Sequence, residues 1–184
     1  AVARQFSKWN SDALACMSRQ YLRAARASLI KRETAYGALF TTITLAAITG
    51  ADLEFDVLNV FAFIALAFSE CSAFRELMLD TLAKCPCSVT QPWRLIIYTD
   101  EVTTGNQLAH DNKRRCHAIY ISFLEFGAAV LSQEDAWICV AALRSARLEL
   151  AQAGICQAFK AIIKMMFTAG GTTFQHTGIR LRGP

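Results

Sequence analysis

The chain has 184 residues, enough for one ordinary domain or two small ones. Hydrophobic residues make up 54% of it, charged residues only 18%, and the formal net charge is +4. This composition excludes an intrinsically disordered protein, because disorder requires low hydrophobicity and high net charge. Such a chain buries much of its surface, lies against a membrane or packs into a larger assembly.

The first segment, residues 3–33, contains no glycine or proline and is predicted to be a helix. Arg19, Arg23 and Arg26 recur at helical spacing and form one basic stripe. A stripe of this kind contacts phosphate groups of nucleic acid or of lipid headgroups, or it is simply a solvated helix face. Both interpretations remain open at this point.

Two uncharged runs follow, at residues 34–51 and 57–69, separated by an acidic segment. We expect them to form a hairpin of two apolar helices with an acidic turn between them. The second run is shorter than a membrane span, which favours a hairpin buried in a soluble core. The alternative is a hairpin that contacts a membrane, because the first run reaches the lower limit of a spanning length.

Residues 70–84 continue as an amphipathic helix, and the segment 85–92 holds two of the three prolines in the chain. Proline ends helices, so we place a domain boundary there. β-Branched and aromatic residues then dominate three runs, at 93–102, 116–127 and 136–143. Residues 146–167 show a helical apolar stripe, and residues 174–181 are expected to be a closing strand.

The predicted order after the boundary is therefore strand, strand, strand, helix, strand. The predicted fold class is α+β, with a helical region over residues 1–90 and a smaller mixed module over residues 91–184.

Two carboxylates, Asp100 and Glu101, end the first of these strands. Side chains alternate along a strand, so Asp100 shares a face with Ile96 and Tyr98 while Glu101 points to the other face. A carboxylate at the end of a strand is a typical Mg²⁺ ligand in phosphoryl-transfer enzymes. It is also commonly a solvated residue that caps the next turn, and the pattern alone favours that interpretation.

The stretch PWRLIIYTDEVTTGNQLAHDNKRRCHAIYISFLEFG, residues 92–127, resembles an uncharacterised family present in many copies in dinoflagellate genomes. The resemblance continues through LSQEDAW, the helix containing AGICQAFKAIIKMMF, and FQHTGIRL, and covers about half the chain. That family is similar to the core of mobile-element transposases with an RNase H-like fold. The resemblance implies a partial RNase H-like β-β-β-α-β unit with Asp100 as the first metal-binding carboxylate.

This sequence departs from the transposase pattern in one important way. A two-metal site needs further carboxylates, and none of those that remain stands where the resemblance would place a second ligand; these are Glu125, Glu134, Asp135 and Glu149. We therefore expect a truncated or repurposed core without catalysis. Mg²⁺ would bind at Asp100 and Glu101 only if other residues completed the site, and no other cofactor is expected.

The function predicted from the sequence is a transposase-derived, non-catalytic module related to nucleic acid. The basic turn at Lys113, Arg114 and Arg115 is the candidate phosphate contact, with a solvated turn as the alternative. A rival hypothesis is an accessory subunit of a larger, membrane-embedded organellar complex, with residues 34–69 against lipid or partner helices. An odd number of scattered cysteines, seven, favours a reducing compartment inside the cell, in the nucleus or an organelle.

Overall fold

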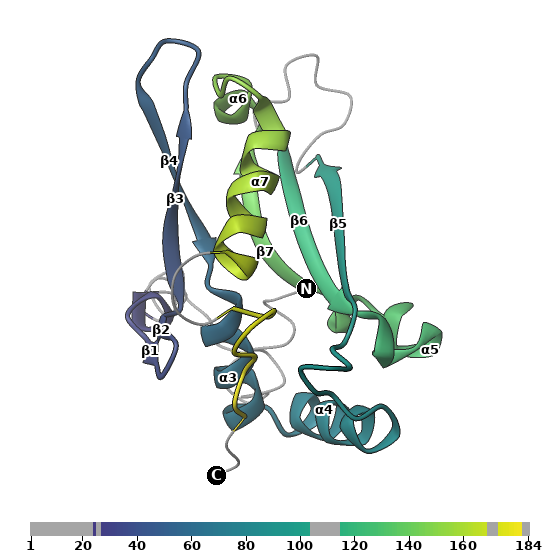
Figure 1. Ribbon diagram of the computed structural model, residues 1–184. Helices are drawn as coiled ribbons and strands as arrows, with labels where there is room; N and C mark the ends of the chain where they lie inside the picture. Colours follow the sequence, from purple (N-terminus) through teal and green to yellow (C-terminus); the bar gives the residue numbers. More distant parts are fainter. Residues whose placement is uncertain (1–23, 25–26, 104–114, 169–172, 182–184) are drawn as a thin grey trace.

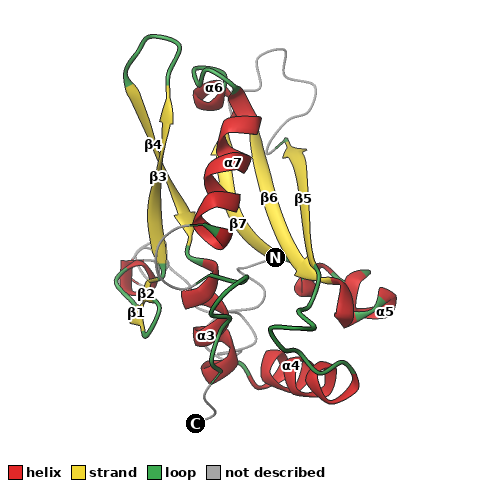
Figure 2. Cartoon of the chain, in the orientation of Figure 1, coloured by secondary structure: helices red, strands yellow, loops and turns green. Residues whose placement is uncertain are grey.

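The computed structural model describes residue 24 and residues 27–103, 115–168 and 173–181 (Figure 1). The described residues form three small antiparallel sheets and several helices (Figure 2). In chain order the strands and helices are β1 (Glu33–Thr34), β2 (Gly37–Ala38), β3 (Phe40–Ala46), β4 (Asp52–Leu58), α3 (Val60–Glu70), α4 (Ser72–Lys84), β5 (Leu95–Val102), β6 (Cys116–Phe123), the 3₁₀ turn η2 (Leu124–Phe126), α5 (Ala128–Leu131), the 3₁₀ turn η3 (Glu134–Ala136), β7 (Ile138–Arg144), α6 (Ser145–Leu148) and α7 (Gly154–Phe167).

The predicted helical hairpin over residues 34–69 is wrong in its first part, because the four strands β1 to β4 lie within residues 33–58. β3 and β4 pair antiparallel, with Phe40 opposite Leu58 and Ala46 opposite Asp52. Ile43 and Leu45 are buried between exposed threonines, which is the two-residue period of a half-buried strand. The run lacks charge because its exposed positions carry threonine, and β-branched threonine favours a strand over a helix.

The predicted acidic turn is likewise part of a strand, β4. Its acidic residues Asp52, Glu54 and Asp56 occupy the exposed positions, whereas Phe55 and Val57 are buried. Alternation of carboxylates with apolar side chains is the pattern of a strand with one wet face. The turn itself lies before this strand, at residues 47–51, where Gly50 has a φ of 83°.

The two helices that follow agree with the sequence. α3 begins at Val60 and is buried along most of its length, and α4 covers most of the predicted amphipathic segment 70–84. Asn59 caps α3, since its side-chain oxygen accepts a hydrogen bond from the Ala62 N–H. Its amide nitrogen donates to the carbonyls of Tyr36 and Ala38 at 2.9 and 3.1 Å. One side chain thus joins the first hairpin to the start of α3.

The three strands predicted after residue 90 are present as an antiparallel meander in the order β5-β6-β7. The predicted helix is divided into α6 and α7 by a turn at residues 149–153. Residues 174–181 form turns and coil rather than the closing strand. The predicted fold class, a helical N-terminal half followed by a partial RNase H-like unit, is therefore wrong: strands occupy residues 33–58, and the described part of the chain is mixed throughout.

One hydrophobic cluster includes residues from both sides of residue 90, among them Leu45 of β3, Ile64 of α3, Ile119 of β6 and Ile162 of α7. α7 runs alongside the β3–β4 hairpin and the strands β6 and β7 (Figure 1). Most of the predicted basic helix at residues 3–33 lies outside the described residues, apart from a helical turn at 27–30. Among the described helices, none is long and apolar enough to cross a membrane.

We expect Asn59→Ala to lower the free energy of unfolding by about 1–2 kcal/mol, because it removes a helix cap. The same substitution also leaves the carbonyls of Tyr36 and Ala38 without their amide donor. Urea denaturation followed by circular dichroism measures this change. Ser69→Ala is the matched control near the other end of α3, where the side chain is exposed, the lost bond lies within the helix, and the cost should stay below about 0.5 kcal/mol.

Candidate functional site

The β5-β6-β7 sheet has two faces of different character. Ile97, Ile121 and Leu143 lie on the inner face, which belongs to the hydrophobic core. Tyr98 lies directly opposite Tyr120 in the strand register, on the outer face. Alternation along a strand forces this separation, because successive side chains point to opposite sides of the sheet.

Three aromatic rings gather on the outer face: Tyr98, Tyr120 and Trp137, which we call the aromatic face. The rings of Tyr98 and Tyr120 are stacked, with centroids 6.2 Å apart and planes 26° from parallel. Trp137 meets Tyr98 edge-on, also at a centroid separation of 6.2 Å. Tyr98 is 51% exposed, and the other two side chains are half-buried. The group therefore presents ring surface to solvent.

The aromatic face is held in place by the surrounding backbone. The indole N–H of Trp137 donates to the Leu131 carbonyl at 2.9 Å, which fixes the orientation of the ring. Tyr120 stands in the central strand, between β5 and β7. Burial, and to a lesser degree the nearby thiols of Cys139 and Cys116, raises the pKa of the Tyr120 phenol above its usual value. Tyr120 therefore stays neutral at physiological pH.

This cluster was not predicted from the sequence, because Tyr98, Tyr120 and Trp137 belong to segments that lie apart along the chain. The sequence feature that pointed toward the cluster was the placement of Tyr98 on one strand face with Ile96 and Asp100. Joining Tyr98 to Tyr120 and Trp137 requires the pairing register of β5 with β6 and of β6 with β7. Register between strands of distant sequence is a tertiary property.

The structure separates the two carboxylates proposed as metal ligands. Asp100 is exposed on the outer face, opposite Ala118, beside the row that holds the two tyrosines. Glu101 is opposite His117 on the inner face, so the two side chains point away from each other. One metal ion cannot be held between them in this arrangement. Within the described ranges, no three His, Cys, Asp or Glu side chains form a group suited to a metal ion.

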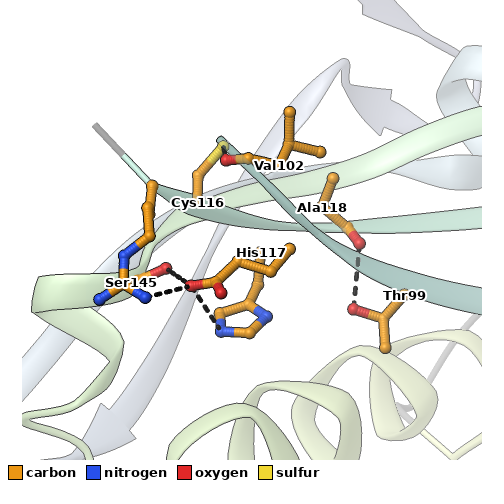
Figure 3. A network of polar contacts seen from close by, with 8 residues as sticks. Thr99, Val102, Cys116, His117, Ala118 and Ser145 are labelled. Carbon is orange, nitrogen blue, oxygen red and sulfur yellow. Dashed lines mark hydrogen bonds and ion pairs between the residues drawn. The ribbon is translucent and has the colours of Figure 1, made fainter. Parts of the chain in front are cut away.

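Glu101 is the centre of a polar cluster at the end of the sheet, together with Ser145, Arg115 and His117 (Figure 3). The Ser145 hydroxyl donates to Oε1 of Glu101 at 2.9 Å. The Arg115 guanidinium lies 3.6 Å and the His117 imidazole 3.9 Å from the same oxygen. Ser145 begins α6 and is only 4% exposed, and its N–H donates to the Arg115 carbonyl at 3.0 Å. The cluster thus connects β5, β6 and α6.

This arrangement is suited to holding the end of the sheet rather than to nucleophilic catalysis. An activated serine needs a base that accepts its proton, normally a histidine that is oriented by a carboxylate. Here the Ser145 hydroxyl donates to the carboxylate itself, and the contact of His117 is to the same carboxylate oxygen rather than to the serine. The contacts therefore point to a structural anchor.

The basic turn predicted to contact phosphate is only partly described. Lys113 and Arg114 lie outside the described residues, so their placement is not stated. Arg115 is exposed at the start of β6, and its guanidinium is directed to Glu101 on the inner face. It is thus on the opposite side of the sheet from the aromatic face.

Comparison with protein-family models, with curated proteins and with solved structures finds no match to this chain. Its function is therefore inferred from the geometry of the site.

Replacing Ser145 with alanine should destabilise the protein by about 1–2 kcal/mol. The Glu101 carboxylate then loses the Ser145 hydroxyl, which is buried and is its closest hydrogen-bond donor. Equilibrium urea unfolding measures the difference. Ser132→Ala removes an exposed serine-to-carbonyl bond at the end of α5 and should change stability by less than about 0.5 kcal/mol. Equal effects of the two substitutions would contradict the anchoring role of Glu101.

A second prediction concerns the thiol beside the aromatic face. Burial, followed by the neighbouring Cys116, raises the pKa of the Cys139 thiol. A raised pKa leaves a smaller thiolate fraction at pH 8, and the thiolate is the reactive form. We expect Cys139 to be alkylated by iodoacetamide more slowly than the exposed Cys87, as measured by mass spectrometry of the labelled peptides. Equal rates at the two cysteines would disprove this environment for Cys139.

Proposed function

We propose that the chain is a non-catalytic nucleic-acid-binding module that holds single-stranded bases on the aromatic face. The observation that carries this proposal is the grouping of Tyr98, Tyr120 and Trp137 on one exposed side of a sheet. Bases stack on exposed aromatic rings, and sheet-borne aromatics are a common platform for single strands of nucleic acid. This proposal keeps the nucleic-acid part of the function predicted from the sequence.

Two further features support nucleic-acid binding without catalysis. The formal net charge of +4 favours an anionic partner. Exposed Arg144 lies at the end of β7, opposite outer-face Cys116 in the register, where a cation is suited to a phosphate. The carboxylates needed for a two-metal mechanism are divided between the two faces of β5. Asp100 is then a neighbour of the platform rather than a catalytic ligand.

The decisive experiment is a titration of fluorescently labelled single-stranded DNA and RNA with the full chain, followed by anisotropy at several salt concentrations. The wild-type chain should bind single strands more tightly than duplex, and binding should weaken as salt rises. Tyr98→Ala should weaken binding about 5- to 150-fold, since one stacked base contributes about 1–3 kcal/mol.

Phe40→Ala is the matched control, because Phe40 is an aromatic residue of similar exposure on a different sheet. It should leave the affinity unchanged. Asp100→Asn should not weaken binding, because it removes a negative charge beside the platform without changing the rings. If Tyr98→Ala and Phe40→Ala bind equally well, or if no salt-sensitive binding is found, the proposal fails.

A further inference from the structure

The strand β5 forms one end of the β5-β6-β7 sheet (Figure 1). Within the part of the chain that the structure describes, β5 pairs with β6 and with no strand on its other side. Its eight residues, LIIYTDEV, contain no proline, glycine or lysine. Proteins commonly protect a sheet edge from other chains with prolines, lysines or bulges. β5 has no proline, lysine or bulge, and its charged residues Asp100 and Glu101 both lie near one end.

The hydrogen-bond pattern identifies which backbone groups of β5 point outward. The Leu124 N–H donates to the Arg94 carbonyl at 2.9 Å, so the backbone of Arg94 is directed toward β6. Direction alternates along an antiparallel strand, so the N–H and C=O groups of Leu95, Ile97, Thr99 and Glu101 are directed away from β6. These four residues supply a regular row of donors and acceptors at the edge that no described strand covers.

We propose that this edge pairs antiparallel with β5 of a second copy of the chain, about a two-fold axis at Tyr98. In this register Ile97 faces Thr99 of the second copy, and Leu95 faces Glu101 of the second copy. All of these residues have outward backbone groups, so each pair exchanges hydrogen bonds. The pairing is isologous, and the contact closes as a dimer.

Charge favours this register and this partner. Arg94, just before the strand, pairs with Glu125 at 3.1 Å while its side chain stays 73% exposed, and Asp100 is an exposed anion near the other end of the strand. Antiparallel pairing about Tyr98 makes Arg94 of one copy a diagonal neighbour of Asp100 of the second copy. An axis at Thr99 would instead place the two Asp100 carboxylates diagonally across from each other, which is unfavourable. Charge therefore favours the axis at Tyr98 over the axis at Thr99.

The dimer also changes the aromatic face. Residues directly opposite each other in an antiparallel pair lie on the same side of the sheet, so the two Tyr98 side chains meet on the outer face. The two aromatic faces then form one continuous surface across six strands. A role of this surface in holding a longer single strand depends on the proposed function, whereas the strand pairing itself does not.

The first test is disulfide formation by Tyr98→Cys in the absence of nucleic acid. At the two-fold axis the two substituted positions form a non-hydrogen-bonded pair with Cα atoms about 4.5 Å apart, a distance that a disulfide spans. Mild oxidation should give a dimer linked at position 98, identified by mass spectrometry among the native cysteines. Asp100→Cys is the matched control on the same strand and face, where the two positions are about 14 Å apart in this register. Equal linkage at positions 98 and 100 would overturn the register.

The second test is Thr99→Pro, followed by sedimentation equilibrium. The Thr99 N–H points outward, so proline removes a backbone bond of the dimer without removing a backbone β5–β6 bond. The wild-type chain should show a concentration-dependent dimer, and Thr99→Pro should remain a monomer with an unchanged circular dichroism spectrum. Thr99→Val keeps the N–H and, like proline, lacks the hydroxyl that donates to the Ala118 carbonyl, so it should still form dimers. A wild-type chain that is monomeric at every concentration tested would refute the pairing, even if single strands bind.

Discussion

The packing of α7 is the constraint on which the described structure depends. Among the described residues, the β3–β4 hairpin and the β5-β6-β7 sheet share no hydrogen-bonded strand pair. The buried side chains of α7, Ala158, Ile162 and Met166, belong to the cluster that includes both sheets. Burying an isoleucine or methionine contributes about 1.5–3 kcal/mol, and α7 adds this burial to the direct contact between β4 and β7.

The turn before α7 strengthens the same connection through the backbone. The Ile48 N–H donates to the Leu150 carbonyl at 2.8 Å, and the Gln152 N–H donates to the Ala46 carbonyl at 2.9 Å. These bonds join the end of β3 to the segment that interrupts the predicted continuous helix. The interruption at residues 149–153 is thus explained, because its backbone groups pair with the hairpin instead of continuing a helix.

The inner face of the β5-β6-β7 sheet packs in the hydrophobic core, and the polar residues of β5 lie on both of its faces. The inner side uses Glu101 to anchor Ser145 and the start of α6. The outer side carries the aromatic face, with Asp100 in the adjoining row. Consecutive residues of a strand thus serve different purposes, one structural and one directed to solvent. This division explains why two adjacent carboxylates, which suggest a metal site along the sequence, do not form one.

The sequence by itself determined α3, α4, the three strands β5, β6 and β7 and the separation of Asp100 from Glu101, because periodicity and alternation are local properties. It did not determine the β3–β4 hairpin, since absence of charge was interpreted as apolar helix although Thr42 and Thr44 alternate with buried Ile43 and Leu45. It also did not determine the aromatic face. Tyr98 and Trp137 are far apart in the chain, and only the register across β6 brings them together, because strand pairing is fixed by the packing of the whole sheet against its core.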